Sequence, residues 1–457
     1  MAGAIVATMP RRCWKPGACV SALFLLLATF AVGFAPVALA APTGRIAYIG
    51  TDHNVYACSG DCDRPLCITC PSHGIHVELD PQMSPLRLVQ ETEPAPRRPL
   101  HYAWPTFSPD GSKLAFAWAG PRADGNLFGI SCYDFKTRQT LDIFGSESQR
   151  VVYISWTPDG KNLSFLLDER QGLSLILAEI KEHAPARIVM SGAPLFFDWS
   201  RDAGKLLVHS RAADPSEGES IELVSVTPTN QTVERVLAKG RVPFKTPCWS
   251  ADGRHLAYIA NFAAETYLVV ADADGTHPRT LASLPVGMSS FVWSPDSREI
   301  AFSTEVIGEQ GVFHGIDLLD IGTGKTRQLT RDNVLAYFFS PDARYLAYVS
   351  VPEDRPYYTW KLIDLKHARV RTLDNFLSTQ LEALAYRFFD QLAVSHTIWS
   401  PDSKEFVYAG VRILGEPHQA LPLAPPPSLW IVSTQDGKSR SVAPATLAFY
   451  SSASGAK

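Results

Sequence analysis

A short segment with an aromatic residue, a turn around an aspartate and an apolar strand occurs seven times in this chain. Residues 293–302, WSPDSREIAF, are one copy. The proline presets φ for a tight turn, and the aspartate accepts hydrogen bonds from nearby backbone. Because this turn explains each aspartate, we predict a structural role for all seven. They follow one another at intervals of 43 to 60 residues: Asp110, Asp159, Asp202, Asp252, Asp296, Asp342 and Asp402.

Each repeat is long enough for four antiparallel strands, which is the blade of a β-propeller. Residues 45–50 read as the second strand of a blade that lacks its first strand, and residues 446–451 are a spare strand after the last repeat. We therefore predict an all-β propeller of four-stranded antiparallel blades. Its C-terminal strand would complete the N-terminal blade and remove the open edges. Seven repeats and this composite blade predict eight blades, with seven as the alternative if a terminal segment packs outside the ring.

The repeated W-S-P-D-G-x-x-[LI]-A-[FY] pattern resembles the propeller repeat of the TolB family, which is also found in dipeptidyl-peptidase-type enzymes. The resemblance covers about residues 45–451 and implies a fold rather than an activity. TolB-family proteins have an α/β domain followed by a propeller, whereas the repeats here directly follow the N-terminal segment. No G-x-S-x-G occurs in the sequence. We therefore expect a propeller without the TolB α/β domain and without a peptidase domain.

The first 40 residues have the layout of a secretory signal peptide. Three basic residues, Arg11, Arg12 and Lys15, precede an apolar run over residues 17–35, and the segment 38–40 reads Ala-Leu-Ala. We predict cleavage after Ala40 and one propeller domain over residues 41–457. The protein would then be extracytoplasmic, either periplasmic or secreted. The alternative is an uncleaved N-terminal membrane anchor, which is the one case in which we expect contact with a membrane.

Composition limits the partners. Of the 457 residues 46% are hydrophobic, which provides a large core, and the formal net charge is −4. The chain has no long basic run, so we expect no nucleic-acid partner.

Three stretches interrupt the repeat. Residues 71–103 and 415–428 are rich in proline and are predicted as loops. Residues 375–396 have apolar positions with helical spacing at Leu377, Leu381, Leu384, Phe388 and Leu392. Thr379 and Glu382 fit a capping box for this helix. The helix would lie at one mouth of the propeller, either as a lid or docking helix or packed on its own blade.

Four cysteines lie close together in the sequence: Cys58, Cys62, Cys67 and Cys70. In an oxidising compartment they predict two disulfides, whose pairing the sequence leaves open. Free or mixed thiols, or a metal site completed by His73 and His76, are the alternatives. Cys132 and Cys248 fall on strands three blades apart, so we expect separate buried thiols.

The residue three places before each motif aromatic should occupy an equivalent place on the innermost strands that line the channel. These residues are aromatic on one side of the ring and small on the other, with a histidine between the two sides. Such a surface suits a sugar ring or a peptide side chain, and the alternative is simple packing between the inner strands. The positions are Trp104, Tyr153, Phe196, Thr246, Ser290, Ala336 and His396.

We predict a non-catalytic extracytoplasmic binding or scaffold protein that uses a propeller face or the channel mouth to bind protein partners in the cell envelope or outside the cell. The alternative is a lyase or hydrolase acting on a small molecule or glycan at that mouth. Catalysis requires acid, base or metal groups that converge there, and the sequence places only His396 at the mouth. We therefore predict no catalytic residue, no metal and no cofactor.

Overall fold

All strand pairs in the computed structural model of this chain are antiparallel within the described residues. These are residues 44–452 without 71–74, 79–86, 91–99, 123–124, 182–184, 212–217, 241–245, 263–264, 286–288, 307–308, 310, 354, 394 and 415–424. Residues Pro42–Lys457 form one compact unit and Met1–Ala41 another. The predicted signal peptide and the interior of the 415–428 loop lie outside the described residues.

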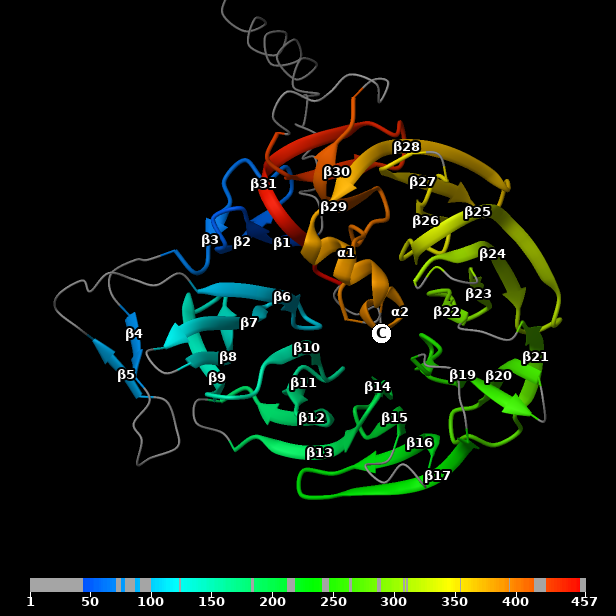
Figure 1. Cartoon of the computed structure of the whole chain (residues 1–457), viewed down its shortest axis with the longest axis horizontal. Helices are drawn as coiled ribbons and strands as arrows, with labels where there is room; N and C mark the ends of the chain where they lie inside the picture. The colour runs from blue at the N-terminus through cyan, green and yellow to red at the C-terminus, as the bar shows by residue number, and fades with distance from the viewer. Residues whose placement is uncertain are drawn as a thin grey trace, which may run out of the picture. The chain divides into compact units, whose positions relative to one another are not determined.

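Four sheets of four strands follow one another along the chain, as the repeat predicts. In Figure 1 they are arranged around a ring. Their strands are β6 (His101–Phe107), β7 (Lys113–Arg122), β8 (Gly125–Asp134) and β9 (Gln139–Ser146); β10 (Val151–Trp156), β11 (Asn162–Glu169), β12 (Gly172–Glu179) and β13 (Arg187–Gly192); β14 (Leu195–Trp199), β15 (Lys205–Arg211), β16 (Glu219–Val226) and β17 (Gln231–Gly240); and β18 (Cys248–Trp249), β19 (His255–Phe262), β20 (Glu265–Asp272) and β21 (Arg279–Leu284).

The remaining ring strands form a continuous 13-stranded sheet, because long strands pass from one repeat into the next. Strand β25, for example, pairs with β24 through its first half and with β26 through its second half. The strands are β22 (Ser289–Trp293), β23 (Glu299–Glu305), β24 (Phe313–Asp320), β25 (Thr326–Phe339), β26 (Tyr345–Ser350), β27 (Tyr358–Asp364), β28 (Arg369–Ser378), β29 (Glu405–Arg412), β30 (Ser428–Ser433), β31 (Ser439–Tyr450), β1 (Arg45–Gly50), β2 (Val55–Ser59) and β3 (Leu66–Cys67).

The two ends of the unit meet in this sheet. The last part of β31 lies antiparallel to β1, with Ala47 opposite Phe449 and Ile49 opposite Leu447. The predicted closure by the C-terminal strand is therefore confirmed. The number of blades stays a prediction.

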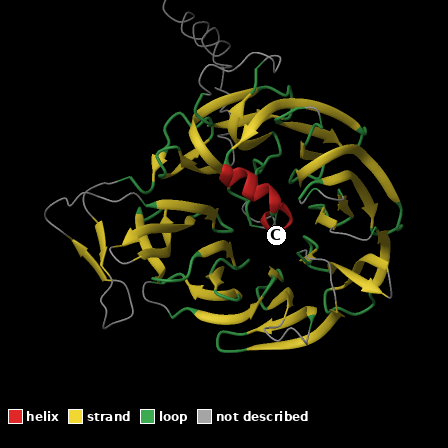
Figure 2. Cartoon of the chain, in the orientation of Figure 1, coloured by secondary structure: helices red, strands yellow, loops and turns green. Residues whose placement is uncertain are grey.

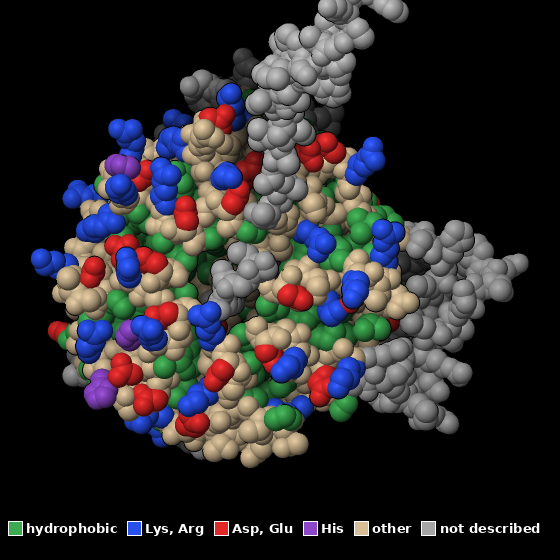
Figure 3. Space-filling view, turned by 180° about the vertical axis from the view of Figure 1, so that it is seen from behind, with side chains coloured by type: hydrophobic (Ala, Val, Ile, Leu, Met, Phe, Trp, Pro, Cys, Tyr) green, Lys and Arg blue, Asp and Glu red, His purple; other side chains and the backbone are tan. Residues whose placement is uncertain are grey.

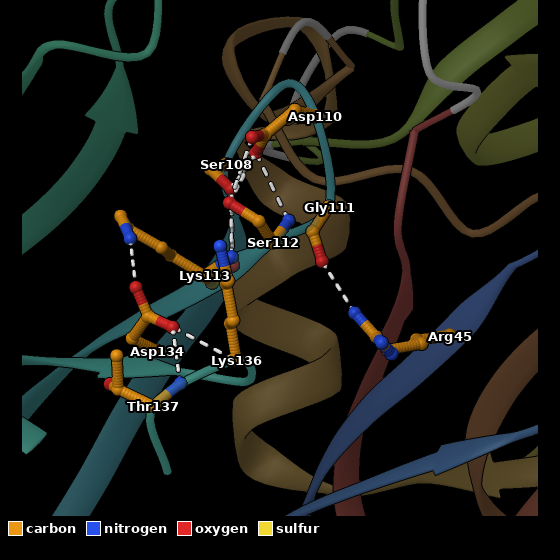
Figure 4. A network of polar contacts seen from close by, with 9 residues as sticks. All are labelled: Arg45, Ser108, Asp110, Gly111, Ser112, Lys113, Asp134, Lys136 and Thr137. Carbon is orange, nitrogen blue, oxygen red and sulfur yellow. Dashed lines mark hydrogen bonds and ion pairs between the residues drawn. The ribbon is translucent and has the colours of Figure 1, made fainter. Parts of the chain in front are cut away.

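The turn aspartates have the structural role that the sequence predicts. Figure 4 shows the first turn, where the Asp110 carboxylate accepts hydrogen bonds from the Ser108 hydroxyl and from the backbone N–H of Ser112. Arg45 of β1 donates a 2.6 Å hydrogen bond to the carbonyl of Gly111 in the same turn. The hydroxyl and backbone bonds recur at the other six aspartates.

Four of the five motif tryptophans bond to the repeat before their own. The indole N–H of Trp156 donates to the Thr106 carbonyl of β6, and that of Trp199 donates to the Ser164 hydroxyl of β11. Trp293 and Trp399 bond backward in the same way. A buried indole usually finds such an acceptor, so at these four positions the motif aromatic sets the contact between neighbouring blades as well as filling the core.

Two of the predicted interruptions need correction. The 71–103 stretch is not only loop, because β4 (Ile75–Glu78) and β5 (Arg87–Gln90) pair as a hairpin and β6 begins at His101. The predicted helix over 375–396 begins only at α1 (Gln380–Arg387), followed by α2 (Phe389–Leu392), as Figure 2 shows. Residues 376–378 still belong to β28, where they pair with 410–412.

Candidate functional site

Helices α1 and α2 lie inside the ring (Figure 1), with α1 against β29 and β31 of the blade that follows it. The buried ring of Phe389 packs against rings from two other strands, Phe313 of β24 and Tyr337 of β25, with centroids 6.1 and 4.6 Å away. The expectation that this helix packs on its own blade therefore holds for α1, whereas α2 reaches across the ring to strands of other blades. Together the two helices occupy the centre of the ring.

Gln391 of α2 holds the insertion to the opposite side of the ring. Its side-chain amide donates to the Phe197 carbonyl at 2.9 Å and to the Tyr153 hydroxyl at 3.2 Å. Its Oε1 accepts the Phe197 N–H at 3.3 Å. The amide thus pairs with β14 much as a neighbouring strand would, which satisfies backbone groups that would otherwise be unpaired in the interior.

Glu382 of α1 is also buried against strands of the ring. Its carboxyl group accepts a 3.0 Å hydrogen bond from the Tyr386 hydroxyl, and the backbone N–H groups of Ala409 and Ala448 lie near it. Burial raises its pKa to about 8, although these three donors oppose the shift. The Thr379 hydroxyl accepts the Glu382 N–H, so the helix cap is confirmed, while the Glu382 side chain turns into the core instead of completing the box.

The seven predicted channel residues do line the interior, but all are buried, with at most 8% exposure. His396 contacts Trp104 and Tyr153, at centroid separations of 6.2 and 6.1 Å. Phe196 lies near His209. The small residues Thr246, Ser290 and Ala336 occupy the other side, and within the described part of the chain the Thr246 and Ser290 hydroxyls have no hydrogen-bond partner. Because these side chains are buried, binding by them stays a prediction.

Hydrogen bonds connect His396 to Tyr153 through Ser395. The Tyr153 hydroxyl donates to the Ser395 hydroxyl at 2.8 Å, and the Ser395 hydroxyl is hydrogen-bonded to Nδ1 of His396 at 2.7 Å. Burial lowers the pKa of His396 to about 3, with the backbone carbonyl of Trp104 opposing the shift. The imidazole is therefore neutral at physiological pH. The ring is buried and its Nδ1 is engaged with Ser395, so His396 is poorly placed to act as a general base.

Trp104 itself has an unusual backbone. Its φ is +53°, a left-handed value that is rare for a bulky residue, and β6 shifts register between Ala103 and Thr106. Such strain persists only where the surroundings enforce it. Here the bulge brings the Trp104 ring against His396.

Two of the apolar residues whose spacing predicted the helix are exposed in the structure. Leu384 and Phe388 are one helical turn apart and remain 39% and 42% exposed. They belong to the segment that fills the channel, so this patch lies on a rigidly held element. We call Leu384 and Phe388 the α1 patch.

A separate open groove of about 430 Å³ lies between β11–β12 and β14–β15. Its lining is Asp168, Glu169, Gly172, Leu173, Ala193, Pro194 and Arg211. Two of the three charged groups of the groove form ion pairs, Asp168 with Arg150 and Arg211 with Glu219, and Glu169 accepts hydrogen bonds from Ser174 and Gln149. The repeat could not indicate this groove, because its residues lie at strand ends outside the motif.

The four clustered cysteines form two disulfides, Cys58–Cys62 and Cys67–Cys70. The prediction of disulfides is thus confirmed, and the structure supplies the pairing. Cys132 and Cys248 are free and buried, as expected. In the described part of the chain no three His, Cys, Asp or Glu side chains gather as a metal site would need; His73 lies outside that part, and the side chain of His76 is not described.

Acidic and basic side chains are interspersed over the face shown in Figure 3. A mixed surface of this kind has no large field of one sign to steer a charged partner. Among the described residues, none of the helices is both long and apolar enough to cross a membrane.

Comparisons with known proteins concern the fold. No family model matches the chain. Among curated proteins, dipeptidyl-peptidase 5 of Porphyromonas endodontalis is 26% identical over 72 residues, which are 16% of this chain and 10% of that protein. The match therefore spans only a tenth of that peptidase.

Solved structures similar to this chain are propeller proteins of different activities. A prolyl endopeptidase has a TM-score of 0.51 at 12% identity, over 77% of this chain and 50% of its own. An oligogalacturonate lyase in complex with manganese has a TM-score of 0.48 at 14% identity, over 79% and 96%. TolB from Acinetobacter baumannii has a TM-score of 0.38 at 18% identity, over 74% and 82%. At these identities the likeness concerns the fold alone: the chain is a β-propeller similar to those of TolB proteins and of several enzymes.

Proposed function

We propose that this chain is a non-catalytic binding or scaffold protein that works outside the cytoplasm after cleavage near Ala40. One observation carries the proposal: α1 and α2 fill the centre of the ring, and Gln391 and Glu382 fix them there through buried polar contacts. The inner residues that an enzyme would need at an open channel are buried, and His396 is neutral and engaged. The centre therefore serves as a rigid support.

The α1 patch is the surface that we propose for protein binding. Exposed apolar side chains on a rigid element suit the centre of a protein interface, because little conformational entropy is lost when they are covered. The partner would be a protein of the cell envelope or the extracellular space that presents an apolar surface.

A pull-down with residues 41–457 as bait tests this proposal. The bait is compared with a Leu384→Asp/Phe388→Asp variant. This variant leaves the buried residues of α1 and α2 unchanged. We expect an envelope protein to bind the wild-type bait and to lose at least tenfold in retention on the variant, since a charge must then be buried at the interface.

A Val233→Asp/Val236→Asp variant is the matched control. These residues are also apolar and exposed, at 48% and 41%, but they lie on the distant outer strand β17. Equal retention by all three baits would mean that the partner binds a surface other than the α1 patch. If no protein binds any bait and a small molecule binds the 430 Å³ groove instead, the scaffold proposal is wrong.

A further inference from the structure

The two disulfides of the 58–70 segment lie in different environments. Cys58 and Cys62 are each 5% exposed and belong to a core cluster with Ile46 and Tyr48 of the ring. Cys67 and Cys70 are only partly buried, and Cys67 ends the two-residue strand β3 at the edge of the 13-stranded sheet. Because exchange requires an attacking thiolate to reach a sulfur atom, access differs between the two bonds.

The Cys67 sulfur is also prepared to carry negative charge. The backbone N–H of Cys70 donates to Sγ of Cys67 at 3.0 Å. A hydrogen bond from a backbone N–H favours a thiolate over a thiol, so it makes Cys67 the better leaving group when the bond is cleaved.

The other sulfur faces a different group. Sγ of Cys70 lies 3.7 Å from the Tyr56 hydroxyl oxygen, and that hydroxyl donates its own proton to Asp52 at 2.7 Å. The Tyr56 oxygen can thus accept a hydrogen bond from a Cys70 thiol and offers no proton to a thiolate. The hydrogen bond to Asp52 raises the pKa of Tyr56 to about 12, so this arrangement holds at physiological pH.

From this asymmetry we propose that Cys67–Cys70 is a thiol–disulfide exchange site for an extracytoplasmic dithiol, whereas Cys58–Cys62 is a structural bond. A thiolate of the dithiol attacks Sγ of Cys70, a mixed disulfide forms, and the electron pair of the broken bond goes to Sγ of Cys67. The second thiol of the dithiol, once deprotonated, attacks the mixed disulfide and releases Cys70. The dithiol is oxidised to a disulfide, and its two electrons and two protons reduce Cys67 and Cys70 to thiols.

This inference goes beyond the proposed function and does not require the α1 patch. Reduction would act on the edge strand alone, because Cys58–Cys62 and the pairing of β1 with β31 remain intact. The site would therefore open and close chemically while the ring persists.

Graded reduction of the native mature protein tests the proposal. The protein is treated with increasing dithiothreitol, alkylated with N-ethylmaleimide without denaturant, and digested for peptide mass spectrometry. We expect half-maximal labelling of Cys67 and Cys70 at a dithiothreitol concentration at least tenfold below that for Cys58 and Cys62. Buried Cys132 and Cys248 stay unlabelled if the fold is intact. Equal concentrations for both pairs, or earlier labelling of Cys58 and Cys62, would overturn the proposal.

Variants in which one cysteine of the Cys67–Cys70 pair is replaced by serine test the assigned leaving group. In Cys70→Ser the backbone N–H to Cys67 is kept, so Cys67 should react with iodoacetamide at a lower pH than Cys70 does in Cys67→Ser. A midpoint at least one pH unit lower supports the assignment. Equal midpoints, or a lower midpoint for Cys70, would contradict it, whatever the pull-down shows.

Discussion

At the scale of single residues, two buried groups of the insertion respond to pH in opposite directions. His396 has a pKa of about 3 in the fold against 6.5 ordinarily, so the unfolded chain takes up the proton first and stability rises from pH 3 to 6.5. Glu382 has a pKa of about 8 against 4.5, so the folded chain keeps its proton longer and stability falls as pH rises from 4.5 to 8. Of these two groups, only Glu382 changes the stability of the fold between pH 6.5 and 8.

We therefore predict that Glu382→Gln flattens the pH dependence of stability between pH 6.5 and 8. The glutamine keeps the size of the side chain but cannot ionise. The wild type should lose up to about 1.4 kcal/mol per pH unit in this window. Urea unfolding at several pH values measures both slopes, and comparing slopes removes any constant effect of the substitution. Equal slopes in the two proteins would mean that Glu382 does not titrate in the core.

The indole contacts between repeats give a second prediction. Trp199→Phe removes the hydrogen bond to Ser164, and we expect a loss of about 0.5–1.5 kcal/mol beyond the packing change. Trp249→Phe is the control, because the Trp249 N–H has no hydrogen-bond partner in the described part of the chain. Phenylalanine already occupies this motif position at 107 and 339, so the ring fits. Urea unfolding that finds Trp249→Phe equally costly would rule out the hydrogen bond as the cause.

At the scale of elements, the helix of the insertion and its start could be predicted from the sequence, but its position in the ring could not. The spacing of Leu381, Leu384 and Phe388 predicted a helix, and Thr379 predicted its start, because both signals are local. Leu377 continues the same spacing but lies in β28, since pairing with Val411 overrides periodicity. That the helix fills the channel depends on Gln391 reaching Phe197, a contact between segments far apart in the sequence.

Removing the helix cap should weaken the insertion. Thr379→Ala leaves the Glu382 N–H without its acceptor and also removes a hydrogen bond to the Thr446 carbonyl. We expect a loss of about 0.5–2 kcal/mol in the free energy of unfolding, measured in urea. Among the described residues the Ser378 hydroxyl bonds only to the adjacent Thr379 carbonyl, so Ser378→Ala should change the free energy of unfolding by less. Equal losses would show that the cap does not hold α1.

At the scale of the whole molecule, the repeat decides most of the structure. Seven copies of one motif predicted the strand order, the turns and the closure, because each blade repeats the same turn and the same strand pairing. The candidate site was harder to predict. Trp104, Tyr153 and His396 lie together in the interior, and binding by them stays a prediction; their burial follows from the insertion, and the pairing of the cysteines follows from the path of β2 and β3.

Ring closure predicts the effect of truncation. A chain that ends at residue 444 lacks the part of β31 that pairs with β1, so both edges are exposed and we expect a clear loss of thermal stability, by about 10 °C or more in Tm. A chain that ends at residue 452 keeps this pairing and should unfold like the full chain. Similar Tm values for both truncations would argue against closure by β31.

Hydrogen exchange tests whether α1 and α2 belong to the folded core of the ring. Mass spectrometry of the native mature protein would follow the peptides that cover residues 380–392 and compare them with peptides from the buried strand β26. We expect both sets to exchange at similarly slow rates, because their amides open only with the core. If the insertion exchanges within seconds while β26 stays protected, the helices are not part of the core and the channel residues regain the role of an open binding site.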